Sequence, residues 1–455
     1  MLWEGNTTME PTVIEVAQAP SSARLSLYRD ITLMFYLLYV FCAGLSAMLG
    51  DAPDALVSPS ANASSASNQF VLLGLFMIAL TIARASELTS KAIFKGTAPY
   101  LAVLLIVAAS PLWSKVPDVA IRRVLRFLLE FSALNLLASC YRDPRELLGV
   151  VWRTITIVVG LDIILLVMPE LSYTDIGYQG IHGHKNQAGS FALLALPVAL
   201  AAWARPGIAP SRIAALVVFA AVLFIVVVSQ SKTSAVLALV SLVLAGLVLA
   251  LSRLSGGVLV VTMLLAVGLG LVASYLISNS SVRLDTLLSA LSIDPTLTGR
   301  DEVWRFTRMH ASDRPWLGLG YGSFWNAGPT NEDNLRDFGI TFAFGQAHNG
   351  YLDVLVQVGA IGMGCVFVMA AGILARLFSL ARAGCDAVVA AVGLTIFSTF
   401  WLHNITESTL LRPGTDMWVL FVLLTLLIVK VSPSTFLNLA TKGPRPNEPI
   451  RRRLS

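Results

Sequence analysis

Long apolar runs recur along most of the chain and constrain its fold more than any other feature. About 20 apolar residues in succession span the hydrocarbon core of a bilayer as a helix. The chain has 455 residues, of which 56% are hydrophobic and 13% are charged. Soluble domains carry about 25% charged residues, so this chain lacks the polar groups to cover a soluble surface. We therefore expect an all-α polytopic membrane protein.

The runs predict about twelve membrane-spanning helices. The fourth run starts with Arg122, Arg123 and Arg126, so one interpretation is a helix that begins at the membrane interface. The predicted spans are 31–49, 69–83, 98–113, 121–140, 147–168, 189–204, 213–230, 233–251, 257–277, 350–375, 386–403 and 416–431.

Lys and Arg residues gather in alternate connections between these runs, which predicts that both termini are cytoplasmic. The same pattern explains the net charge of +5 without a nucleic-acid partner. The charge pattern and the apolar runs divide the chain into five parts: a cytoplasmic tail (1–30), nine spans (31–277), a large outer catalytic loop (278–349), three spans (350–431) and a basic cytoplasmic tail (432–455). In a bacterium this outer loop is on the periplasmic side, and we expect the functional residues to lie at that face of the membrane.

Two lysines break this charge pattern, because they lie at the predicted outer boundary. Lys185 follows His182 and His184, and Lys232 lies in a short polar break between two apolar runs. A lysine at such a place requires an anionic partner, which is either a protein carboxylate or a bound phosphate. The alternative is that Lys232 extends toward lipid headgroups. Two histidines without a fixed third ligand do not make a metal site.

Four segments resemble the O-antigen ligase and polysaccharide polymerase superfamily of bacterial inner membranes. They lie in the family's order and on one predicted membrane face. The resemblance is closest to the exopolysaccharide branch, the succinoglycan-type polymerases. The segments are His184-Lys185-Asn186, Ser231-Lys232-Thr233, Gly299-Arg300 with Trp304 and 315–320, and 348–352.

This resemblance implies a membrane glycosyltransferase with a GT-C-like architecture. Such an enzyme moves a growing glycan from undecaprenyl pyrophosphate onto a hydroxyl of the next lipid-linked repeat unit. It implies a metal-independent reaction without a cofactor, in the lipid bilayer, with a flippase and a chain-length regulator as partner candidates. Two alternatives stay open: a ligase that passes the glycan to a lipid A core or another acceptor, and a transporter or flippase of polyprenyl-linked sugars.

Within the resemblance, His348 and Arg300 are the candidate catalytic residues. An imidazole titrates near neutral pH and can accept the hydroxyl proton. A guanidinium matches the geometry of phosphate and stays charged. The structural alternatives are that His348 caps a helix or bonds to the loop backbone, and that Arg300 pairs with Asp301, Glu302 or another loop carboxylate.

The other candidates bind substrate. Lys232 is the second cation for the pyrophosphate, at a position where the wider family has arginine, and Lys185 is a third. His184 orients the same segment. Arg305 supports Arg300 or is a solvated loop residue.

Overall fold

The structure is a computed structural model that describes residues 22–44, 66–141, 143–174, 177–251, 300–325, 345–382 and 387–430. The predicted span 257–277 lies outside the described residues, as do most of the predicted loop 278–349 and the tail 432–455.

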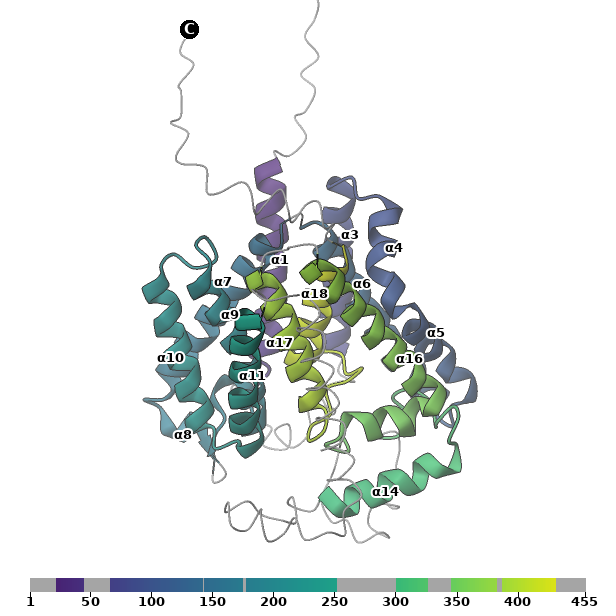
Figure 1. The fold of residues 1–455 in the computed structure, drawn as a ribbon. Coiled ribbons are helices and arrows are strands. Elements are labelled where there is room, and N and C mark those ends of the chain that lie inside the picture. The colour runs from purple at the N-terminus through teal and green to yellow at the C-terminus, as the bar shows by residue number, and fades with distance from the viewer. Residues whose placement is uncertain are drawn as a thin grey trace, which may run out of the picture.

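The described residues form a helical bundle with one short hairpin (Figure 1). The hairpin pairs β1 (Tyr173–Thr174) with β2 (Gly177–Tyr178). The α-helices are α1 (Ser22–Phe41), α3 (Ala66–Ala85), α4 (Ser90–Thr97), α5 (Leu101–Ala109), α6 (Pro117–Ser139), α7 (Pro144–Leu165), α8 (Pro169–Ser172), α9 (Lys185–Ala204), α10 (Arg212–Val228), α11 (Lys232–Leu251), α14 (Arg300–Asp313), α16 (Gly350–Arg382), α17 (Ala387–His403) and α18 (Asp416–Lys430). Three 3₁₀ turns are η3 (Ala98–Tyr100), η4 (Ser110–Trp113) and η5 (Gly180–His182).

Several helices are long and apolar enough to cross a membrane. Among the described residues, four segments meet this criterion by length and composition: Ser90–Trp113, Pro144–Leu165, Lys185–Ala204 and Gly350–Leu380. Four shorter apolar helices accompany them: Gln69–Ala85, Arg212–Val228, Lys232–Val243 and Val388–His403. The chain is thus a multi-pass, all-α membrane protein, whereas twelve spans and a GT-C-like architecture stay predictions.

The connection between the predicted spans 69–83 and 98–113 is partly helical. Lys91 and Lys95, which the charge pattern assigns to a cytoplasmic connection, lie in α4. Thr89 caps this helix by accepting a hydrogen bond from the Ala92 N–H at 3.3 Å. The chain then continues through η3 into α5, so the segment that starts at Ser90 is longer than the predicted span 98–113.

One of the arginines at the start of α6, Arg123, contacts the chain beyond α14. The Arg123 guanidinium donates to the carbonyls of Gly322 and Trp325, the latter at 2.8 Å. Pro117 stands in the first turn of the helix, where its missing N–H costs nothing. These contacts give the charge of Arg123 a role within the protein, and they place the start of α6 at the same end of the bundle as α14 (Figure 1).

Helix α16 is bent at Gly359, which has φ 65° and ψ −169°. The bend lets the segment 315–320 pair with the opened backbone. The N–H groups of Leu319 and Gly320 donate to the carbonyls of Val356 and Gln357, and those of Ala360 and Ile361 donate to Pro315 and Trp316. The first part of α16 therefore runs beside α14, and the second part belongs to the bundle (Figure 1).

The apolar side chains of α14 build a small core separate from the main one. Val303 and Phe306 pack with Phe324, Trp325 and Val356. The aromatic residues of the predicted loop thus include some that form the loop's own core, and α14 is fixed on α16.

Gly359→Ala tests the bend. An added Cβ would lie 2.3 Å from the Trp316 carbonyl carbon, at a φ that alanine rarely adopts. We expect the substitution to lower the free energy of unfolding by about 2–3 kcal/mol. The melting temperature of the purified protein in one detergent checks this. The control is Gly364→Ala in the same helix, where the added Cβ meets nothing within 4 Å. Equal melting temperatures for the two variants would contradict the bend.

Candidate functional site

The termini of several helices meet at the α14 end of the bundle. Three of these helices begin with a cation: α9 with Lys185, α11 with Lys232 and α14 with Arg300. The first turn of a helix exposes N–H groups and the positive end of the helix dipole. In α9 and α11 the first turns lie side by side, because a Cβ on Gly189 would lie 2.2 Å from the Ser234 hydroxyl oxygen. This end of the bundle therefore favours anions.

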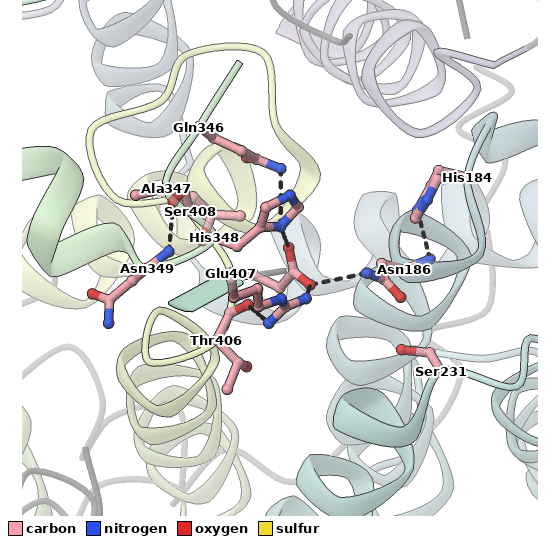
Figure 2. Close-up of polar contacts among 12 residues, drawn as sticks. His184, Asn186, Ser231, Gln346, Ala347, His348, Asn349, Thr406, Glu407 and Ser408 are labelled. Carbon is pink, nitrogen blue, oxygen red and sulfur yellow. Dashed lines mark hydrogen bonds and ion pairs between the residues drawn. The ribbon is translucent and has the colours of Figure 1, made fainter. Parts of the chain in front are cut away.

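The Glu407 carboxylate joins three segments of this end (Figure 2). Its Oε2 lies 2.9 Å from Nδ1 of His348. Its Oε1 accepts from an Arg300 NH2 group and from the Asn186 side-chain amide, each at 2.9 Å. Arg300 also donates to the Thr406 carbonyl. One carboxylate thus connects the start of α9, the start of α14 and the segment that precedes α16.

Glu407 fixes the tautomer of His348. A carboxylate can only accept hydrogen bonds, so Nδ1 of the neutral imidazole carries the proton and Nε2 carries the lone pair. The Gln346 side-chain amide lies 3.4 Å from the same Nδ1. The imidazole is therefore oriented as a base at Nε2.

The residues on both sides of His348 are held by the protein. The Ala347 N–H donates to the Asp353 carboxylate, and the Ala347 carbonyl accepts from the Trp304 indole at 2.8 Å. The Asn349 N–H donates to the Ser408 hydroxyl. The Asn349 side chain then caps α16 by accepting from the N–H groups of Tyr351 and Leu352, each at 3.1 Å. Held in this way, His348 adopts a φ of 49°, a sparsely populated conformation for a residue with a side chain.

The turn after α17 is equally fixed. The Asn404 carbonyl and the Glu407 carbonyl both accept from the Gly350 N–H, at 2.8 and 3.0 Å. The Asn404 side chain accepts from the N–H groups of Thr409 and Leu410. A Cβ at position 350 would lie 2.1 Å from the Asn404 amide oxygen, so only glycine fits after Asn349. The turn that carries Glu407 and the segment that carries His348 are therefore one unit.

The charges of the site act on each other. Burial disfavours the ionised form of Glu407, but the nearby His348 and Arg300 outweigh burial and hold the pKa of Glu407 well below its usual range. Burial lowers the pKa of His184. The positive charges of His348, Lys185 and Arg300 lower this pKa further, whereas the negative charge of Glu407 raises it. His184, Lys185, Arg300 and His348 thus lie in one electrostatic neighbourhood around Glu407.

The remaining predicted residues have different environments in the structure. His184 caps α9, because its Nδ1 accepts from the Asn186 N–H at 3.1 Å. Lys232 is exposed at the first position of α11. Arg305 lies on the exposed side of α14, whereas Val303 and Phe306 are buried, so the turn of the helix separates it from Arg300. Roles in substrate binding stay predictions for all three residues.

His182 has a structural partner. Its Nε2 lies 3.0 Å from the Asp162 carboxylate, which also accepts from the Tyr178 hydroxyl and the Ile181 N–H. This buried pair fixes η5, two residues before α9 begins. No group of three or more metal-ligating side chains occurs among the residues that the structure describes.

Sequence reasoning missed Glu407. It considered loop carboxylates near Arg300 in sequence, but Glu407 lies 107 residues further along the chain. The available signal was the polar run of residues 406–409 between two apolar segments at the predicted outer face.

The family described as O-antigen ligase matches residues 215–367, which include Lys232, Arg300 and His348. The chain is also similar to the exopolysaccharide production protein ExoQ of Rhizobium meliloti (strain 1021), with 33% identity over 81 residues. This similarity covers 17% of the chain and 19% of ExoQ. Together the two matches confirm the resemblance to the O-antigen ligase and polysaccharide polymerase superfamily, in the branch of ExoQ.

The Glu407 network generates a prediction on stability and pH. A carboxyl whose pKa is lowered by folding stabilises the protein above the pKa of the unfolded state, because the unfolded chain binds the proton first as the pH falls. We expect wild type to be more stable than Glu407→Gln at pH 6. Below the unfolded pKa of about 4.3, this difference shrinks by about 1.4 kcal/mol per pH unit.

Melting temperatures of the two proteins between pH 3.5 and pH 7 check this expectation. The matched control is Glu170→Gln, because Glu170 is exposed, and we expect it to show no such trend. A difference between wild type and Glu407→Gln that is constant over the whole range would contradict the assigned network.

Proposed function

We propose that this protein is an exopolysaccharide polymerase that transfers a growing glycan from undecaprenyl pyrophosphate to a hydroxyl of the next lipid-linked repeat unit, at the periplasmic face of the inner membrane. The observation that carries the proposal is the contact of Glu407 with both His348 and Arg300, at a bundle end where three helices begin with cations. The superfamily resemblance supplies the substrate class.

In the proposed reaction His348 accepts the proton of the attacking hydroxyl through Nε2. Glu407 holds the imidazole in the tautomer that leaves this nitrogen basic, and its charge stabilises the imidazolium that forms. The hydroxyl oxygen forms a bond to the sugar carbon as the bond from that carbon to the pyrophosphate oxygen breaks. The leaving pyrophosphate then takes up the proton that His348 accepted, so the transfer is balanced and the base is regenerated.

Arg300, Lys232 and Lys185 offset the charge that develops on the leaving pyrophosphate. Arg300 uses NH1 and NH2 in its contacts with Thr406 and Glu407, and a guanidinium has five N–H donors. The pair with Glu407 therefore orients the guanidinium and leaves donors for a phosphate oxygen. The first turns of α9 and α11 add N–H groups at the same end.

The direct test is an assay with the purified protein and a lipid-pyrophosphate-linked repeat unit from its host. Chelator is present, and the glycans are sized. A ladder of multimers is the expected result. Transfer only after a lipid A core is added would instead identify a ligase, and folded protein without transfer to any acceptor would favour the transporter alternative.

His348→Ala tests the base. We expect polymer formation to fall by at least about 100-fold, because general-base catalysis contributes about that much or more. Gel filtration and melting temperature check that the variant is folded. His310→Ala is the matched control, since His310 lies at the far end of α14 from Arg300. High-molecular-weight polymer from His348→Ala at the wild-type rate would refute the role.

Variants of Arg300 and Lys232 distinguish the contribution of positive charge from that of the geometry of the side chain. We expect Arg300→Ala to lose most transfer and Arg300→Lys to recover part of it, because lysine keeps the charge and loses the planar donor fork. Lys232→Arg should remain active, and Lys232→Ala should raise the KM for the lipid-linked donor. Initial rates against donor concentration measure both effects. Wild-type kinetics in Arg300→Ala would place the phosphate contact elsewhere.

A further inference from the structure

Four buried polar atoms lie in the region where α9, α11 and α17 pack together, on the side of Glu407 toward the interior of the bundle. They are Ser241 Oγ of α11 and Thr395 Oγ1, Thr399 Oγ1 and His403 Nδ1 of α17. None has a hydrogen-bond partner within the described part of the chain. His403 and Thr399 are each 2% exposed. Buried polar groups without a partner are rare in proteins and are costly in a membrane interior, where no bulk water reaches them.

The three α17 residues form one stripe that faces α9. Thr395, Thr399 and His403 follow at intervals of four residues, which places them on one side of the helix. Thr395 shares a cleft with Val388, Val392 and the α9 residues Pro197, Leu200 and Ala201. The stripe therefore starts at this cleft and ends at His403, one helical turn before Glu407, whose N–H donates to the His403 carbonyl at 2.9 Å.

α9 adds a carbonyl that lacks its usual helical partner at the same level. Pro197 lies inside α9 and has no N–H, so the Leu193 carbonyl cannot receive its usual helical hydrogen bond. Asn186 contacts Glu407, and eleven residues later Pro197 lies in the same cleft as Thr395. Both contacts fit one antiparallel register of α9 and α17. That register places Leu193 opposite Thr399.

α11 completes the arrangement. It runs parallel to α9 from the contact between Gly189 and Ser234. Ser241 is two helical turns beyond Ser234 on the same side of α11, and is thus level with Thr395 and Thr399. Three helices thus carry hydroxyl or carbonyl groups at this level.

We propose that a chain of bound water occupies the interface of α9, α11 and α17 and runs from His403 past Thr399 to Ser241 and Thr395. Bound water typically makes about three hydrogen bonds to buried polar groups that the protein leaves unsatisfied. The cleft at Thr395 is otherwise apolar, so the chain of water ends there. At its other end it hydrogen-bonds the His403 imidazole directly behind the Glu407 turn.

Radiolytic footprinting of the full chain in lipid nanodiscs tests this proposal, because hydroxyl radicals form from water bound beside a side chain. We expect His403 to be oxidised at a rate comparable to that of the half-buried His310. Trp418 is the dry reference: it is 1% exposed and packs against Phe127, Phe400 and Phe421. Protection of His403 equal to that of Trp418 would overturn the proposal.

A pair of variants at Thr399 locates the water. Thr399→Val keeps the shape of the side chain and removes the hydroxyl, so we expect the oxidation of His403 to fall severalfold. Thr399→Ser keeps the hydroxyl and should leave the oxidation unchanged. Oxidation of His403 that is identical in Thr399→Val and wild type would refute the chain of water. The readout requires no glycosyl transfer, so it stands or falls separately from the proposed function.

Discussion

The ionised carboxylate of Glu407 is the interaction on which the functional end of the molecule depends. It lies in the turn between α17 and α18 and contacts groups from α9, from α14 and from the segment before α16. In a bilayer, helices gain little from hydrophobic contact with one another, so polar contacts of this kind decide which helix ends meet. Burying this charge is compensated by Arg300 and His348, and each of those residues is oriented in return.

The helices could be predicted from the sequence because the length of an apolar run fixes the length of a span. The predicted helix 147–168 is observed as Pro144–Leu165, and 416–431 as Asp416–Lys430. α4 could not be predicted in this way, since its lysines resemble those of a cytoplasmic loop, and its helical state depends on a Thr89 cap and on packing. Local sequence patterns thus predict apolar helices well and predict polar helices such as α4 poorly.

The site was predictable in part. His348, Arg300, Lys185 and His184 each stand in a local motif, and the structure brings them around one carboxylate. Glu407 stands in no such motif. It is 59 residues from His348 and 221 from Asn186, and pairing across such distances is decided by how the helices pack. The same limit applies to Arg123, whose partners are carbonyls of a distant loop.

The bend at Gly359 separates two mechanical parts of α16. The residues before it pack against α14 and carry the backbone that holds His348, and residues on both sides of it are bonded to the segment 315–320. The residues after it form the apolar part of the span. When bilayer thickness changes, a spanning helix responds by tilting. The bonds of Ala360 and Ile361 to Pro315 and Trp316 resist a tilt about Gly359, so the segment 315–320 braces the geometry around Glu407 against changes in the thickness of the membrane.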